Sequence, residues 1–189
     1  RKPYKLPRIQ DIMNKRKNYT YCTKIDLSMF LHCLMLDEPS RELCTINTPF
    51  GLYWFNRLPQ GAKVSPDLAQ AVIEKILQNI DTDAYLDDCC LFTDKDFEHH
   101  VGLIDKLLSA LADASMKCNT LKCAWVVQET SFLGHWMTPT AVKPMKIKID
   151  AILKIDSPKN QTQVQSFFGV VNFYRSMWPR RSEEHTSEL

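Results

Sequence analysis

Hydrophobic residues recur at strand-like spacing in the first third of the chain. Aromatic, aliphatic and Thr residues gather in four segments that we predict to be strands: 19–26, 31–36, 42–48 and 52–58. Pro49-Phe50-Gly51 separates the last two segments and is a turn signal, so these two strands are expected to form a hairpin. The pattern therefore predicts a run of strands first.

Helical spacing begins after this run. Ser65-Pro66 is typical of a helix start, and the apolar residues that follow share one face: Ala69, Val72, Ile73, Ile76 and Ile80. A second helix is expected over 97–116, with an inward face made of Ile104, Leu107, Leu108 and Leu111.

A third helix is expected near the end of the chain. It should start near Asn160, with Gln163 as a capping partner. Its expected inward side chains are Val164, Phe167, Phe168 and Val171.

The order of the elements indicates the fold class. Two short apolar arms, 84–88 and 89–92, surround an Asp-Asp pair, and short strands are expected near 124–127 and 131–137. No repeat or flexible linker divides the chain. This order favours an α+β architecture, in which two helices cover one face of an antiparallel sheet.

Composition restricts the class of protein further. The 189 residues are 44% hydrophobic and 24% charged, which is typical of a globular chain rather than a disordered or fibrous one. No apolar stretch approaches the roughly 20 residues of a membrane span, so we expect an intracellular protein without a membrane partner. The seven Cys include no C-x-x-C pair, which argues against a disulfide framework and a zinc module.

Charge is distributed unevenly behind a net value of +2. Residues 1–24 hold eight Lys or Arg and one acid, Asp11. This excess of positive charge indicates either a segment that binds a polyanion or a solvated basic surface without a partner. Residues 181–189 resemble the conceptual translation of a DNA sequencing adapter, and we expect them to be an artefactual tail outside the fold.

Three acids form the candidate chemical site. Asp87-Asp88 lies inside an apolar stretch, where a hairpin corner is the simplest explanation. Asp26, however, ends another apolar strand, where a carboxylate is costly unless something compensates it. Divalent cations would do so, and oxygen ligands favour Mg²⁺ or Mn²⁺. Two such ions about 3.5–4 Å apart suit in-line phosphoryl transfer.

Several blocks around these acids resemble reverse transcriptases in order and spacing. Tyr85-Leu86-Asp87-Asp88 resembles the polymerase signature of that family, and Ile25-Asp26-Leu27 resembles its first catalytic block. Residues 58–66 resemble the second block, and Phe132-Leu133-Gly134-His135 resembles the primer-gripping strand. Residues 4–9, 166–169 and 172–175 are similar to those of gypsy-like LTR retrotransposons in particular.

The resemblance implies an activity and its metal ligands. Asp26, Asp87 and Asp88 would hold two Mg²⁺ or Mn²⁺ ions, with help from the backbone carbonyl of Leu27. The reaction would be DNA synthesis from dNTPs on a primed RNA or DNA template. Because consecutive strand residues face opposite ways unless a turn re-aims one, we expect Asp26 and Asp87 to matter more than Asp88.

The resemblance also implies binding residues. It places Leu31, Gln60, Gly61 and Lys122 near the nucleotide. Its primer and template residues are Tyr85, Leu86, Phe132, Leu133, Gly134 and His135. Leu31 stands where the family usually has an aromatic side chain that excludes the ribose 2′-hydroxyl, which predicts weaker discrimination against ribonucleotides unless Phe30 takes that place.

As a whole, the resemblance implies the palm of a right-hand polymerase with partial fingers and the start of a thumb. The expected division is an initial segment with the first palm strands, a fingers hairpin, the palm, the start of the thumb or connection and the tail: 1–36, 37–64, 65–143, 144–180 and 181–189.

The resemblance further implies a longer parent polyprotein with RNase H and integrase, in a cytoplasmic particle or the nucleus. We expect the isolated piece to be weak or inactive, and its oligomeric state stays open. Two alternatives are an RNA-dependent RNA polymerase-like palm and an inactive nucleic-acid-binding remnant.

Overall fold

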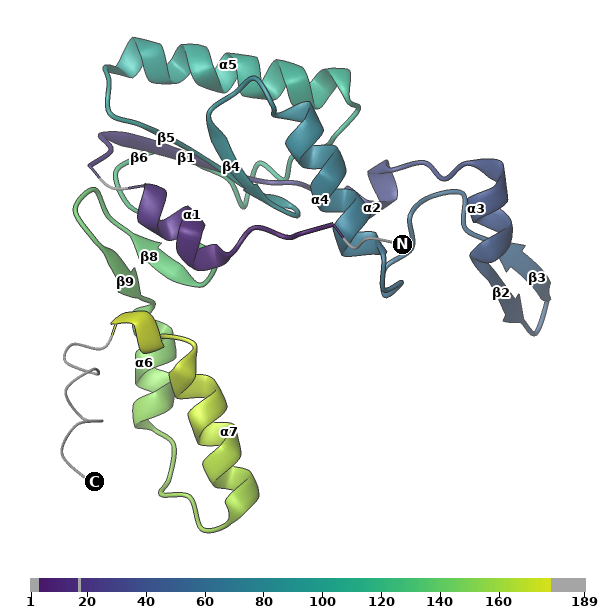
Figure 1. Cartoon of the computed structure of the whole chain (residues 1–189). Coiled ribbons are helices and arrows are strands. Elements are labelled where there is room, and N and C mark those ends of the chain that lie inside the picture. Colours follow the sequence, from purple (N-terminus) through teal and green to yellow (C-terminus); the bar gives the residue numbers. More distant parts are fainter. Residues whose placement is uncertain (1–3, 17, 178–189) are drawn as a thin grey trace.

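The computed structural model describes residues 4–16 and 18–177 and is centred on a four-stranded antiparallel sheet (Figure 1). In spatial order its strands are β4 (Thr82–Tyr85), β5 (Asp88–Thr93), β1 (Tyr21–Asp26) and β6 (Ala124–Val127). β1 lies between β5 and β6, and its buried residues Cys22 and Ile25 face opposite sides of the sheet. The predicted α+β class is confirmed.

Two helices cover one face of this sheet, as the hydrophobic pattern predicts (Figure 1). They are α4 (Ser65–Ile76) and α5 (Phe97–Asp113). Their inward residues pack with the sheet in one core that includes Ile25, Leu91, Ile73, Leu107 and Leu111. Ser65 is the first residue of α4 rather than its N-cap, because its hydroxyl donates to the Pro59 carbonyl at 2.7 Å.

The opposite face of the sheet is covered by smaller elements. These are α1 (Ile9–Lys15) and a second antiparallel sheet of β7 (Thr130–Phe132), β8 (His135–Met137) and β9 (Val142–Pro144). The core between them includes Met13, Cys22, Phe92, Phe132 and Met137. The sequence pattern missed α1 because only two of its residues, Ile12 and Met13, are buried.

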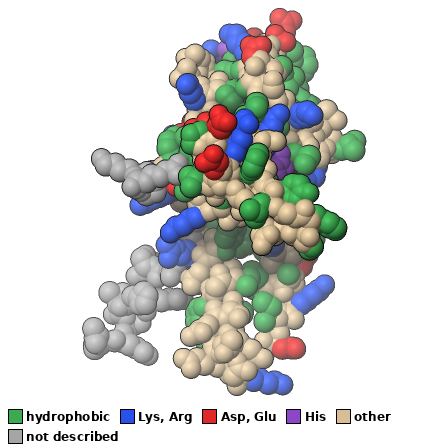
Figure 2. Space-filling model, turned by 90° about the vertical axis from the view of Figure 1, so that its right-hand side faces the viewer, with side chains coloured by type: hydrophobic (Ala, Val, Ile, Leu, Met, Phe, Trp, Pro, Cys, Tyr) green, Lys and Arg blue, Asp and Glu red, His purple; other side chains and the backbone are tan. Residues whose placement is uncertain are grey.

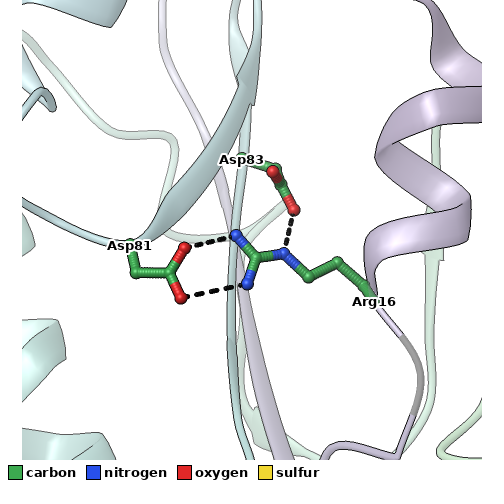
Figure 3. Close-up of polar contacts among 3 residues, drawn as sticks. All are labelled: Arg16, Asp81 and Asp83. Carbon is green, nitrogen blue, oxygen red and sulfur yellow. Dashed lines mark hydrogen bonds and ion pairs between the residues drawn. The ribbon is translucent and has the colours of Figure 1, made fainter.

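An arginine ties the end of α1 to the start of β4 (Figure 3). The Arg16 guanidinium donates to both carboxylate oxygens of Asp81, at 2.6 and 3.1 Å, and its Nε donates to Asp83. Asp83 is only 9% exposed, so this partner offsets the cost of burying its charge. The hydrogen bond from Arg16 also lowers the pKa of Asp81.

A small unit projects from one end of the central sheet (Figure 1). It contains α2 (Phe30–Cys33), α3 (Glu38–Leu43) and a hairpin of β2 (Thr45–Thr48) and β3 (Gly51–Trp54). The hairpin prediction is confirmed, although both strands are shorter than expected. The β3 side chains are exposed, and hydrophobic groups lie among Lys and Arg on this face of the molecule (Figure 2).

The predicted strand over 31–36 is wrong. The chain forms the short helix α2 there, followed by an isolated bridge between Met35 and Arg57. Met29 has a φ of 50° and turns the chain, and the helical turn then buries Phe30, which is 4% exposed, in the main core. Tertiary burial of one aromatic residue thus overrides the strand propensity of the segment.

The last described elements form a helical pair beyond β9: α6 (Lys146–Leu153), α7 (Gln161–Asn172) and the 3₁₀ turn η1 (Arg175–Met177) (Figure 1). Asn160 caps α7 as predicted, since its side chain accepts from the Gln163 N–H at 2.9 Å. The inward placement predicted for Val164 and Phe168 is wrong, because they are 36% and 54% exposed. No residue of α7 is fully buried, since nothing in the described part of the chain covers that side.

Among residues 4–16 and 18–177, no helix is long and apolar enough to cross a bilayer. The adapter-like tail 181–189 and the basic residues Arg1, Lys2 and Lys17 lie outside the described residues.

Candidate functional site

The predicted carboxylates meet at one end of the central sheet. Asp26 ends β1 and stands directly opposite Asp88, the first residue of β5. Leu86 and Asp87 form the turn between β4 and β5, and only Leu86 has a positive φ, 56°, as at the first central position of a type II′ turn. The Leu27 N–H donates to the Asp87 carbonyl at 2.8 Å and fastens this turn to the end of β1. The Asp pair is therefore a hairpin corner and also part of a three-acid site.

The three side chains differ in exposure. The carboxyl groups of Asp26 and Asp88 are partly buried, with side chains 19% and 28% exposed, whereas Asp87 is exposed. Burial raises the pKa of Asp88 above its ordinary value, and the neighbouring charges of Asp87 and Asp26 raise it further. The cluster thus carries the electrostatic repulsion that the sequence predicts.

Two lysines counter this repulsion. Lys24 Nζ lies 3.3 Å from Asp88 Oδ1, and the pairing partly opposes the rise in the Asp88 pKa. Lys122 Nζ lies 4.0 Å from Asp26 Oδ1, so this predicted nucleotide-binding lysine lies beside the site. Each carboxylate at the strand ends therefore has one cationic partner.

The donor set fits a hard divalent cation, because two aspartates face each other across neighbouring strands and a third follows in the turn. As placed, however, the side chains described for this protein form no group of three or more His, Cys, Asp or Glu close enough to hold a metal. A bound ion would have to draw Asp87 inward and compete with the lysines. Leu27, whose carbonyl was a predicted ligand, lies next to Asp26 and is 3% exposed.

A buried glutamine holds the hairpin turn from behind. Gln70 on α4 is fully buried, its Oε1 accepts from the Leu86 N–H at 2.8 Å, and its Nε2 donates to the Ala84 carbonyl at 2.9 Å. The amide also donates to Glu74 Oε1 at 2.8 Å. Sequence reasoning missed Gln70. A polar residue one position after Ala69, on a helix whose inward face is otherwise apolar, was the available signal.

A cavity of about 170 Å³ lies beside the β4–β5 turn and is lined by Asp87. It brings together two predicted nucleotide-binding residues, Leu31 and Gln60, with Leu86 and Asp87 of the turn. Phe30 also lines it, although that side chain belongs to the core. Gly61 follows Gln60 with a φ of 88°, a conformation that favours glycine, and the space that a Cβ would occupy there is open.

The predicted primer-gripping residues form the β7–β8 hairpin. Leu133 and Gly134 make its turn and both have positive φ. Phe132 and His135 are 0% and 4% exposed, so their side chains pack inward rather than toward a ligand. His135 stacks on Phe173, and the Tyr174 hydroxyl donates to the Gly134 carbonyl at 2.9 Å. Tyr85, on the edge strand β4, packs against the core that lies between the central sheet and the elements α1 and β7–β9.

Sequence comparison matches the chain to a family model and to transposon polyproteins. The family model described as reverse transcriptase (RNA-dependent DNA polymerase) matches residues 2–137. The chain is 32% identical over 183 residues to the retrovirus-related Pol polyprotein from transposon 297 of Drosophila melanogaster, covering 95% of this chain and 17% of that protein. It is 26% identical to the transposon Tf2-7 polyprotein of Schizosaccharomyces pombe, with 95% and 14% covered. The chain therefore spans about a sixth of the curated relatives it matches.

Solved structures agree with this grouping. The foamy viral protease-reverse transcriptase dRH in complex with double-stranded DNA superposes with a TM-score of 0.88 at 27% identity, covering 95% of this chain and 32% of that one. The foamy viral protease-reverse transcriptase in complex with an RNA/DNA hybrid gives a TM-score of 0.82 at 27% identity, covering 90% of this chain and 23% of that one. From the family match over residues 2–137 and the retrotransposon relatives, we conclude that this chain belongs to the reverse transcriptase (RNA-dependent DNA polymerase) family.

Proposed function

We propose that this chain is the catalytic part of an RNA-directed DNA polymerase, which transfers nucleotides from dNTPs to a primer 3′-hydroxyl. One observation carries the proposal: Asp26 and Asp88 face each other across β1 and β5, with Asp87 in the adjoining turn beside the small cavity. Family membership supports it, because the matched range, residues 2–137, contains all three aspartates.

In this mechanism the chain holds and orients the reactants. Asp26, Asp87 and Asp88 would bind two Mg²⁺ or Mn²⁺ ions, with the Leu27 carbonyl as a further oxygen donor. When bound, the ions supply positive charge that activates the primer hydroxyl and stabilises the leaving pyrophosphate. No covalent intermediate with the protein is required.

The nucleotide would lie in the cavity beside the turn. Leu31 and Gln60 line it, and Gly61 leaves room for close approach of a base or sugar. Lys122 is exposed beside Asp26, where its charge would attract the triphosphate.

The proposed partners are a primed RNA or DNA template and dNTPs. Support comes from the viral relatives, whose structures contain double-stranded DNA or an RNA/DNA hybrid. The backbone of Leu133 and Gly134, at the β7–β8 tip, and the turn residue Leu86 are the proposed contacts to the primer. Tyr85, Phe132 and His135 would support these contacts from within the fold.

The relatives are polyproteins, so we place the chain in a longer parent polyprotein. RNase H and integrase segments elsewhere in that parent, and its location in a cytoplasmic particle or the nucleus, are part of the proposal.

The test is Mg²⁺-dependent primer extension on RNA and DNA templates, with the chain alone and within its parent polyprotein. We expect activity in the parent and weak activity in the isolated chain. Asp26→Asn and Asp87→Asn should abolish extension in the parent, and Asp88→Asn should reduce it less. Asp105→Asn, an exposed position on α5, is the matched control and should extend normally. Near-normal synthesis by Asp26→Asn or Asp87→Asn would refute the assignment, and an inactive parent would favour a remnant that only binds nucleic acid.

A further inference from the structure

Lys24 is placed differently from an ordinary surface lysine. It lies two residues before Asp26 on the central strand β1, so both side chains emerge on the same face of the sheet. Its partner on β5 is Cys90, which is fully buried, and the next opposed pair on the same face of the sheet is Asp26 and Asp88. The Lys24 side chain is only 19% exposed, and its ammonium nitrogen lies 3.3 Å from Asp88 Oδ1.

The surroundings make this cation necessary when no other is bound. Asp88 is partly buried and is repelled by Asp26 and Asp87. A carboxylate in that position is costly unless a positive charge is near. The second lysine of the site differs, because the side chain of Lys122 is 67% exposed and lies 4.0 Å from Asp26, so solvent screens it strongly.

We propose that Lys24 is an internal counter-ion of Asp88 that a divalent cation must displace, so that Lys24 sets the affinity of the three-acid site for the ion. The proposal rests on the proposed function for the identity of the ion site. Phosphate oxygens of a nucleotide would add ligands and help the ion to displace the lysine.

The direct test is a titration of the 189-residue chain with Mn²⁺ in the absence of nucleotide. The electron paramagnetic resonance signal of free Mn²⁺ measures how much of the ion is bound. Lys24→Met keeps most of the side-chain length and removes the charge. We expect it to bind Mn²⁺ on the order of tenfold more tightly than the wild type, because a half-buried charge near the ion no longer opposes it. Unchanged or weaker binding would overturn the proposal, since a lysine that merely orients Asp88 would help the ion.

Two matched controls separate this effect from net charge. Lys122→Met removes the exposed lysine and should tighten binding by no more than about threefold, because solvent screens that charge. Lys106→Met removes an exposed lysine on α5, which covers the opposite face of the sheet, and should leave the Mn²⁺ affinity unchanged (Figure 1). An equal gain in all three variants would overturn a specific role for Lys24.

A second measurement needs no metal. In the metal-free chain, Lys24→Met should lower the midpoint of urea unfolding, and the loss should largely disappear in an Asp88→Asn background, where no carboxylate needs the cation. Equal losses in both backgrounds would contradict the pairing. Absence of Mn²⁺ binding even in Lys24→Met would also overturn the proposal.

The outcomes distinguish this proposal from the proposed function. Tighter Mn²⁺ binding by Lys24→Met together with an inactive parent polyprotein would refute only the polymerase activity. Normal extension by the parent with equal Mn²⁺ affinity in Lys24→Met and wild type would refute only the role of Lys24.

Discussion

Replacement of the buried Gln70 by Met should loosen the turn that carries Asp87. Met has a similar volume but cannot make hydrogen bonds of comparable strength, so the change opens little space in the core. It removes the acceptor of the Leu86 N–H and the donor to the Ala84 carbonyl, two backbone groups of the hairpin. Leu86 has a positive φ of 56°, which is strained for a leucine and persists only while its surroundings hold it.

The expected magnitude follows from these two bonds. Each backbone group that loses its partner costs about 1 kcal/mol, so the free energy of unfolding should fall by about 2 kcal/mol. For a chain of this size that corresponds to a decrease of roughly 4–8 °C in Tm. The bond to Glu74 adds little, because that side chain is only partly buried.

Urea unfolding measures the global effect, and amide hydrogen exchange measures the local one. We expect the Leu86 amide to exchange about tenfold faster or more in Gln70→Met, whereas the α5 amides should change only as far as global stability does. Gln78→Met is the matched control, because Gln78 is exposed just beyond the end of α4. The prediction is wrong if the free energy of unfolding of Gln70→Met lies within about 0.5 kcal/mol of the wild-type value and exchange of the Leu86 amide is unchanged, because Gln70 then does not hold the turn.

Three further predictions follow from other parts of the molecule. Arg16→Met should lower the free energy of unfolding by about 2 kcal/mol in urea, since it leaves the buried Asp83 carboxylate unpaired; a change below about 0.5 kcal/mol would contradict the role of Arg16. Burial lowers the pKa of His100, so the folded chain holds this ring neutral while the unfolded chain protonates near pH 6.5; stability should therefore fall as the pH drops from about 6.5 toward the lower folded-state pKa. Urea midpoints from pH 8 to 5 check this, and an equally steep decline in His100→Gln would refute it. Leu31→Tyr should increase discrimination against ribonucleotides in single-nucleotide incorporation by the parent polyprotein, because Leu31 lines the cavity beside Asp87; equal rejection by wild type and variant would count against it.

Much of the fold could be predicted because the relevant signals are local. The periodic apolar residues of α4 and α5 predict two helices on one face, and the turn signal at 49–51 predicts the β2–β3 hairpin. Where long-range burial decides, the pattern fails. Burial of Phe30 in the core favours a helical turn where the pattern predicts a strand. Phe168 is exposed on α7, although its spacing predicts that it faces inward.

By itself, the sequence determined the three carboxylates, their family resemblance and the apolar faces of the two helices that cover the sheet, because these depend on residue types at fixed spacing. Only the tertiary structure decided which groups face the carboxylates. Lys24 and Gln70 reach Asp88 and the Leu86 turn because strand register and helix packing bring them there, and neither is marked by a local motif. The physical reason is that propensity acts between near neighbours, whereas pairing and burial join residues far apart in the chain: Lys24 and Asp88 are neighbours only because β1 pairs with β5.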